Sequence, residues 1–429
     1  MILTKKIQIH PSNEAQEKLW QVSYLCKDLW NAAVEQRRDR KSWRKVNLYS
    51  QKKEIPRIKK EFPEYKIPSS QVLQNVIFAV DRSYKMFFTK RGNGDKYVMP
   101  PGFKSFRHFF TQEYSQPGTS FAITEEGILQ LAYGSKPTDW ITIPMNGSIP
   151  EVPRTVTISK QDKKWYACFT YKMPKCELMA DGHRIYFDPG CKTTLTGLKT
   201  TGAFVEYDIN PLRQFNLSTY KLIDELTSQR DKKIMGSYHW RRLNRKIKKL
   251  FSRINTRTKT YLHSLANRIL TDHPDVKEFK VGDWVKQDTL ADTDYAFVNR
   301  RINRAVQNNN PVMRLIEYLS YKGKLRGQAT IKFDERGTTR TCVMCDHNHE
   351  NGIDPGIRTF VCESCSFTYP RDHHSCLNDV KKSEPVLWQR LSGNLPDRSV
   401  RTTLSPFSFK PQVALYAIRI QNTGCFSLQ

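Results

Sequence analysis

The chain has 429 residues, enough for two to four domains at roughly 100–200 residues per domain. Its 70 Lys and Arg residues outnumber 42 Asp and Glu residues, for a formal net charge of +28. Such an excess indicates a polyanionic partner, most often nucleic acid. The sequence contains neither the roughly 18 consecutive apolar residues of a membrane span nor a signal peptide. It therefore predicts a protein of the cell interior that does not bind a membrane.

The N-terminal part begins with a strand and continues in helices. Residues 3–9 alternate between apolar and polar side chains, which predicts a strand, and helical periodicity follows from residue 13 to Trp30. A second amphipathic helix is expected over 71–90. The Lys- and Arg-rich segment 37–66 between them is either a nucleic-acid contact or a solvated face.

A segment that mixes basic and aromatic residues leads into a β region. Lys104 and Arg107 alternate with phenylalanines in PPGFKSFRHFF, so the aromatic rings could stack on bases while the cations contact phosphates. The alternative is a strand whose aromatic side chains pack inward. Residues 119–175 then read as five β segments separated by turns, which predicts a small barrel or sandwich that residues 1–9 would complete.

The middle of the chain predicts three short strands, at 184–187, 191–198 and 203–209, followed by a long helical region over 212–270. Residues 241–259 in this region carry nine basic residues and no acid. We interpret this stretch as a phosphate-facing helix, with a solvated face as the alternative. The candidate nucleic-acid contacts are Arg241, Arg242, Arg245, Lys246, Lys248, Lys249 and Arg253.

Four acidic residues follow predicted strands or begin a helix. Asp188 ends the first strand, Asp283 follows a strand at 278–281, Glu335 follows a strand at 329–333, and Asp372 precedes a short helix. With the predicted helix after residue 311, the order of elements is typical of an RNase H-like fold, in which such carboxylates converge. Two-metal phosphodiester hydrolysis uses Mg²⁺, which prefers hard oxygen ligands. Each acid alone could be a turn residue or a helix cap, but their joint placement favours a site.

Two Cys-x-x-Cys pairs, Cys342 with Cys345 and Cys362 with Cys365, are separated by 16 residues. This spacing predicts a four-cysteine zinc ribbon, and four thiolates leave no coordination position open for catalysis. The zinc is therefore expected to be structural. The other six cysteines are expected to be free thiols, because intracellular thiols stay reduced: Cys26, Cys168, Cys176, Cys191, Cys376 and Cys425.

Several stretches resemble the TnpB proteins of insertion sequences, which are RNA-guided nucleases related to the compact type V CRISPR effectors and to Fanzor proteins. The specific ones are FDPGCKTTLTG, LIEYLSYKGKLRG, ERGTTRTCVMC, RTFVCESC and YPRDHHSCLND. The resemblance is weaker in the N-terminal half, at IQIHPSNEAQEKL, LCKDLWNAAVEQR and PPGFKSFRHFF.

The resemblance implies an α+β multidomain protein. Its expected parts are a wedge-like β-barrel domain at 1–9 and 110–180, a helical recognition domain at 10–109, a RuvC-like, RNase H-fold nuclease domain at 181–337 and 368–382, an inserted zinc ribbon at 338–367, and a loosely ordered tail at 383–429.

The resemblance also implies that Asp188 and Asp372 are the first and last catalytic aspartates. Most relatives have a glutamate after the fourth strand, where this chain has Asp283. Some branches use a glutamate just ahead of the ribbon, where this chain has Glu335. We therefore expect Mg²⁺ at Asp188, Glu335 and Asp372, with Asp283 in reserve. A second departure from the family pattern is the pair His373-His374 after the last aspartate, which could alter metal or substrate contacts.

The implied function is that of an endonuclease that binds a guide RNA, one protein per guide. It would read a short motif beside the target in double-stranded DNA, with base pairing supplying the remaining specificity. Three alternatives remain open: a nuclease-dead guided DNA binder, a DNA-strand-transferring transposase and a plain zinc-ribbon nucleic-acid binder. The departures at residues 283 and 374 keep the first of these open, and the ribbon placement argues against the second. The acids argue against the third.

Overall fold

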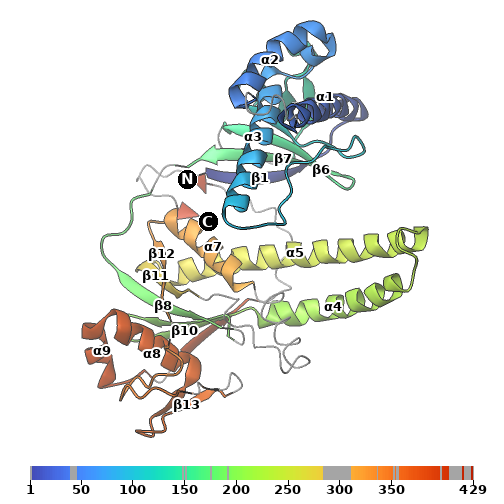
Figure 1. Ribbon diagram of the computed structural model, residues 1–429. Coiled ribbons are helices and arrows are strands. Elements are labelled where there is room, and N and C mark those ends of the chain that lie inside the picture. The colour runs from blue at the N-terminus through green and yellow to red at the C-terminus, as the bar shows by residue number, and fades with distance from the viewer. Residues whose placement is uncertain are drawn as a thin grey trace. The chain divides into compact units, whose positions relative to one another are not determined.

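The computed structural model separates into two compact units, Met1–Pro174 and Lys175–Gln429, which are drawn in Figure 1. The residues that the structure describes are 2–38, 46–146, 149, 152–173, 176–190, 193–283, 311–335, 337–350, 353, 357–396, 399–404, 418–419 and 427–428. Cys191, Cys425 and the segment 284–310 lie outside them. Among the described helices, none is long and apolar enough to cross a membrane.

The first unit contains two antiparallel sheets. The order of the larger is β1-β7-β6-β2, and the register of its β1–β7 pair runs from Ile2↔Lys172 to Ile9↔Trp165. The prediction that residues 1–9 complete the β region is therefore confirmed. The five predicted β segments all form strands, but three of them make a separate sheet, β3-β4-β5. The strands are β1 (Ile2–Ile9), β2 (Gln112–Ser115), β3 (Phe121–Ile123), β4 (Ile128–Leu131), β5 (Ile141–Pro144), β6 (Thr155–Gln161) and β7 (Lys164–Lys172).

The helices of the first unit are α1 (Asn13–Arg38), α2 (Leu48–Glu61) and α3 (Ser70–Gly92), with short 3-10 turns at Pro63–Lys66 and Pro137–Asp139. The helix predicted over 71–90 is confirmed as α3, and the Ser69 side chain accepts from the backbone of Val72 at its start. The basic segment 37–66 contains the helix α2, capped by Asn47.

The second unit is built on a six-stranded sheet in the order β12-β11-β8-β9-β10-β15. The strands β8, β11 and β12 run parallel, so their C-terminal ends lie at the same edge of the sheet. We call this edge the acid edge, because Asp188, Asp283 and Glu335 lie in or directly after these strand ends. The strands are β8 (His183–Pro189), β9 (Leu195–Lys199), β10 (Phe204–Asp208), β11 (Val276–Gly282), β12 (Ala329–Phe333) and β15 (Ser399–Thr403).

Helices cover both faces of this sheet. The predicted helical region 212–270 is two helices, α4 and α5, because the chain turns after Asp231 and Ser237 caps the second helix. The C-terminal half of α5 and the helix α7 pack on one face, against Ile185 and Phe187 of β8. The helices α8 and α9 pack on the other face, against Tyr186. The helices are α4 (Asn210–Asp231), α5 (Tyr238–Asp272), α7 (Val312–Lys324), α8 (Arg371–Ser383) and α9 (Pro385–Ser392).

The tail expected from residue 383 is in part a component of the fold. The helix α9 packs beside α8, and the strand β15 extends the sheet by pairing in parallel with β10. The residues of β15 show no clear periodicity, because an edge strand needs only one partner and few buried side chains. The described residues also form two small two-stranded sheets: β13 (Thr359–Val361) with β14 (Thr368–Pro370), and β16 (Ile418–Arg419) with β17 (Ser427–Leu428).

Candidate functional site

The four ribbon cysteines come together as their spacing predicts. All four Sγ atoms lie within 4.8 Å of one another, with Cys342 Sγ 3.7 Å from Cys365 Sγ and Cys345 Sγ 3.6 Å from Cys362 Sγ. A tetrahedral site with Zn–S bonds near 2.3 Å would have S–S edges of about 3.8 Å. None of the four is in a disulfide. The donor set and the spacing therefore fit a structural zinc ion.

The two Cys-x-x-Cys knuckles share one local geometry. The residue after each pair, Asp346 and Ser366, has a positive φ of 59° and 56° respectively. Each donates its backbone N–H to the carbonyl of the first cysteine four residues earlier, at 3.0 Å. Tight turns of this kind aim the two thiols of a pair at one point, so each half of the ribbon site is set by the local backbone.

The acid edge is assembled from segments that are distant in the sequence. Side chains alternate between faces along a strand, and β8 sends Ile185 and Phe187 to the face covered by α5 and α7. Tyr186 points to the opposite face, and so does Asp188. Phe333 at the end of β12 also belongs to that face. The helix α8 therefore covers the side of the sheet on which the acids gather.

Glu335 lies directly against the end of β11. A Cβ atom at Gly282 would be 1.6 Å from Glu335 Oε2, so the carboxylate occupies the space that only a glycine leaves free. Glu335 Oε2 is buried and has no hydrogen-bond partner among the described residues. Burial raises the pKa of Glu335 to about 8, helped by the charges of Asp188, Asp283 and Asp334.

Asp188 is influenced by three groups on α8. Burial raises the pKa of Asp188 to about 7, and the charge of Asp372 acts in the same direction. A hydrogen bond from Ser375 and the charge of Arg371 oppose the increase. Asp372 lies in the first turn of α8, with its Oδ1 3.5 Å from Arg358 Nη1. The fold thus brings Asp188 near both Glu335 and Asp372.

Asp283 has a different environment. Its side chain is 49% exposed and forms an ion pair with Lys332, with Oδ1 2.7 Å from Nζ. Its charge contributes to the raised pKa of Glu335, so it is a neighbour of the cluster. Of the two candidates for the middle acid, Glu335 is the one whose carboxylate is desolvated and unpaired.

The His373-His374 pair points away from the acid edge. His373 Nε2 lies 2.8 Å from Glu206 Oε1 on β10. His374 Nε2 accepts the backbone N–H of Val343 in the ribbon at 3.2 Å, and its ring stacks on Phe360 at 3.6 Å. Burial lowers the pKa of His374 to about 4, which keeps the ring neutral. The two histidines therefore attach α8 to the sheet and to the ribbon.

One acidic residue at this edge was missed by the sequence interpretation. Asp379 is 1% exposed, and neither of its carboxylate oxygens has a hydrogen-bond partner among the described residues. Burial raises its pKa well above the ordinary value, and the charges of Asp188 and Glu335 add to the effect. The available signal was its spacing, since residues 372 and 379 are seven apart and lie on the same face of a helix.

The two clusters differ in how closely their ligand atoms approach. Within the described part of the chain, the cysteines are the only group of three or more metal-ligating side chains with all ligand atoms within 4.8 Å. The carboxylates lie near one another, but their oxygen atoms do not converge to within 4.8 Å as the sulfur atoms do. Nevertheless, Glu335 and Asp379 offer buried oxygens without partners, which is the donor chemistry that Mg²⁺ takes.

The predicted basic helix lies on the surface. It is the N-terminal part of α5, which packs on α4 through Ile223, Ile247 and Ile254. All seven predicted contacts, from Arg241 to Arg253, are exposed. No ion pair joins any of these seven to an acid of the described residues. Uncompensated cations on one helix are what a phosphate backbone requires.

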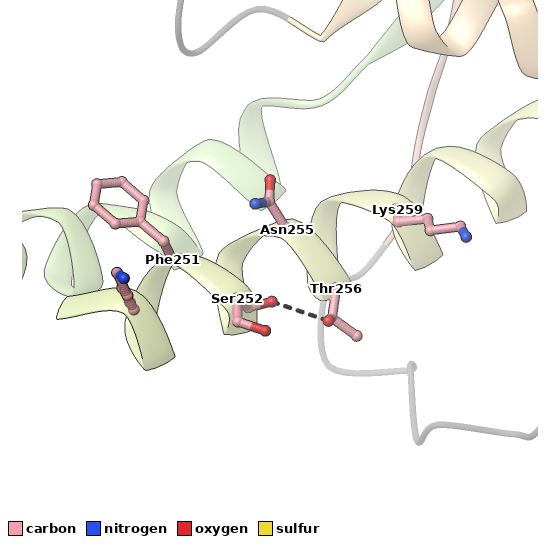
Figure 2. Close-up of a pocket in the computed structure, with 6 residues that line it drawn as sticks. Phe251, Ser252, Asn255, Thr256 and Lys259 are labelled. Atoms are coloured by element: carbon pink, nitrogen blue, oxygen red, sulfur yellow. Dashed lines mark hydrogen bonds between the residues drawn. The ribbon is translucent and has the colours of Figure 1, made fainter. Parts of the chain in front are cut away.

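A surface hollow of about 410 Å³ lies on this helix. Figure 2 shows Phe251 and Lys259 along it, with Ser252, Asn255 and Thr256 between them. The Phe251 ring is 44% exposed. The surface thus combines cations with an aromatic ring and short hydrogen-bonding side chains, as single-stranded nucleic-acid contacts do.

In the first unit, the aromatic segment 103–110 divides into two kinds of residue. The buried amine of Lys27 donates to the carbonyls of Phe106 and His108 at 2.9 Å each, and Phe109 packs edge-on against Trp165. These contacts hold the segment on the unit. Lys104 and Arg107 stay exposed and are available to phosphates.

Three comparisons agree on the relatives of this chain. Residues 313–378 match the family model "Cas12f1-like, TNB domain". The chain is 22% identical over 326 residues to the "Putative RNA-guided DNA endonuclease InsQ" of Escherichia coli (strain K12), which covers 74% of this chain and 75% of the relative.

Solved structures show the same fold. The chain is similar to the protein of the "Cas12f1-sgRNA-target DNA complex" with a TM-score of 0.58 and 12% identity, covering 88% of this chain and 98% of the other. It is similar to the "mini-RNA-guided endonuclease CRISPR-Cas_phi3" with a TM-score of 0.53 and 9% identity, covering 88% and 93%.

Proposed function

The chain belongs to the family of TnpB and Cas12f-like proteins, and from this premise we propose that it is an RNA-guided DNA endonuclease. It binds a guide RNA transcribed from its own element, reads a short motif beside the target in duplex DNA, and hydrolyses the DNA with Mg²⁺. The observation that carries the proposal is the neighbourhood of Asp188, Glu335 and Asp372 at one edge of the sheet.

In this proposal the acids at the edge bind the cation and the substrate phosphate. A bound Mg²⁺ supplies Lewis-acid stabilisation of charge on the phosphate oxygens. Asp188 is oriented by the hydroxyl of Ser375, and Glu335 is placed by the absence of a side chain at Gly282. Both acids have a raised pKa in the metal-free protein, so cation binding is expected to release protons.

The remaining surfaces have separate tasks. The exposed cations of α5 bind the guide RNA, and Lys104 and Arg107 of the first unit contact nucleic-acid phosphates. The ribbon holds a structural zinc ion and positions nucleic acid near the acid edge, since His374 and Asn378 of α8 both bond to its backbone. One protein acts per guide RNA.

One experiment separates this proposal from its rivals. The protein is purified with RNA expressed from its own locus, and the bound RNA is sequenced. Guide-directed cleavage of duplex DNA is then measured with Mg²⁺ and with EDTA. Bound RNA with Mg²⁺-dependent cleavage supports the proposal. Bound RNA without cleavage identifies a guided DNA binder, and the absence of a defined RNA contradicts guided recognition altogether.

A further inference from the structure

Asp379 is a buried charge that the fold does not compensate within the described residues. Its carboxylate is 1% exposed, and both of its oxygens lack hydrogen-bond partners. An unpaired buried carboxylate is costly, because it loses its hydration without gaining a partner. Neighbouring residues of α8 do have partners: Asn378 donates to the carbonyls of Thr338 and Thr341 at 2.7 Å.

The position of Asp379 on α8 directs it to the acid edge. Residues 372, 375 and 379 are spaced by three and four, so they share one helix face. The first two members of this face already reach Asp188, through the charge of Asp372 and the hydrogen bond from Ser375. The carboxylates that act on Asp379 itself are Asp188 and Glu335.

The groups around Asp379 leave its oxygens available. Lys381 donates its Nζ to the carbonyl of Val343 and to Asp346 Oδ1, and Lys382, whose charge acts on Asp379, donates its Nζ to the carbonyl of Asp334 at 3.1 Å. Its charge is the weakest of the influences on Asp379. Glu335 Oε2, just after the end of β12, is also buried and without a partner among the described residues. The carboxylate oxygens of Asp379 on α8 and Glu335 Oε2 after β12 therefore both lack partners at the acid edge.

We propose that Asp379 contributes a fourth carboxylate to the divalent-cation site at the acid edge, together with Asp188, Glu335 and Asp372. This inference rests on the proposed function. It also has a charge argument: two divalent cations carry four positive charges, which three carboxylates do not neutralise and four do. With the cations bound, the oxygens of Asp379 gain the partners that the described protein groups do not provide.

The test measures cation binding as well as cleavage. The full chain is compared with Asp379→Asn, which keeps the shape and removes the charge, and with Asp283→Asn, the same change at an exposed acid of the same edge. Mn²⁺ affinity is measured by calorimetry or by electron paramagnetic resonance of free Mn²⁺. We expect Asp379→Asn to weaken Mn²⁺ binding at least about tenfold and Asp283→Asn to change it less than about threefold.

Thermal unfolding supplies a second readout. Without metal, Asp379→Asn removes a repelling buried charge and is expected to raise the melting temperature, while the further increase caused by Mn²⁺ becomes smaller than in the unchanged protein. An unchanged Mn²⁺ affinity in Asp379→Asn would overturn the inference. If this variant does not fold, Asp379→Ser, which is smaller and uncharged, is measured against the same criterion.

Cleavage distinguishes this inference from the proposed function. If Asp379 holds a cation, Asp379→Asn is expected to need at least about tenfold more Mg²⁺ for half-maximal cleavage. Cleavage by the unchanged protein, together with an unaltered Mg²⁺ requirement and Mn²⁺ affinity in the variant, would overturn the role of Asp379 and leave the nuclease proposal intact. Weakened Mn²⁺ binding in the variant of a protein that does not cleave would support the cation site and contradict the nuclease.

Discussion

The zinc ribbon and the acid edge belong to the same unit and are built by opposite means. In the ribbon, each half of the site comes from a turn of five residues, and Asp346 and Ser366 give the two turns the same backbone geometry. At the acid edge, the residues come from β8, from the ends of β11 and β12, and from α8. The ribbon site depends on local backbone, whereas the acid edge depends on the whole sheet.

This difference also appears in the electrostatics. Two of the Sγ–Sγ separations already match the edge of a tetrahedral site, and all four Sγ atoms lie within 4.8 Å of one another, so zinc would bind with little rearrangement. The carboxylates at the acid edge repel one another, and their pKa values are raised by burial and by mutual charge. In the absence of a cation these acids therefore retain protons more readily than free carboxyl groups do, and a bound cation is expected to draw the acids together.

The largest expected effect is the loss of zinc from the ribbon. Cys342→Ser removes one of four zinc ligands, and structural zinc sites of this kind bind with about 10–16 kcal/mol. We expect the zinc content, measured by mass spectrometry of the purified protein, to fall from one ion per chain to nearly none. The buried free thiol of Cys376, which contacts Thr196 on β9, is the control. A Cys376→Ser protein that loses its zinc would contradict the assignment of the four ligands.

The next effect tests the acid edge. Glu335→Gln keeps the size of the side chain and removes its charge, and we expect cleavage to slow at least about 1000-fold because several kcal/mol of metal-assisted stabilisation are lost. Target binding, measured by filter retention, should stay within about threefold. Asp283→Asn is the matched control, since its exposed pair with Lys332 is worth at most about 1 kcal/mol. An inactive Asp283→Asn beside an active Glu335→Gln would reverse the assignment of the middle acid.

A smaller effect comes from the backbone that supports Glu335. In Gly282→Ala the new methyl group would overlap Glu335 Oε2, so the carboxylate has to move, and a displacement of about 1 Å can cost 100-fold in rate. We expect cleavage to fall about 100-fold while zinc content is unchanged. Gly393→Ala is the control, because a Cβ there has no heavy atom within 4 Å. Full activity of Gly282→Ala would show that the position of Glu335 is not critical.

The same contrast explains what the sequence could predict. The convergence of Cys342, Cys345, Cys362 and Cys365 was predicted, because it follows from their spacing in the sequence. Glu335 was preferred over Asp283 from its place just ahead of the ribbon, but its burial against Gly282 of the neighbouring strand is not revealed by sequence spacing. Asp379 was missed because its role depends on what a helix face meets across the sheet.

The fold of the second unit shows the same limit. Strong periodicity and turn signals located β8, β10, α7 and β12 close to their true bounds, whereas β9 begins four residues later than predicted. The strand β15 was not predicted, because a five-residue polar edge strand carries little periodicity. It joins β10 across almost 200 residues of chain, and pairing at such a distance has no local signature.

The smallest expected effect is a pH dependence of the stability of the acid edge and of its stabilisation by Mg²⁺. The pKa of Asp188 is raised from 3.8 to about 7 and that of Glu335 from 4.5 to about 8, so in this range the folded, metal-free protein holds more protons than the unfolded chain. Its free energy of unfolding therefore falls as pH rises from about 4 to about 8. Mg²⁺ competes with these protons, and the increase in melting temperature that it causes should grow over the same range.

This prediction is measured as the Mg²⁺-induced change in melting temperature at pH 5, 6, 7 and 8. A change of 1 kcal/mol corresponds to about 2–4 °C for a unit of this size, so shifts of a few degrees are expected at pH 8 and little at pH 5. Glu335→Gln removes one of the acid-edge groups whose pKa is raised and should reduce the steepness of the dependence. An equally steep dependence in that variant would show that Glu335 does not contribute to it, which would contradict a role for Glu335 in cation binding.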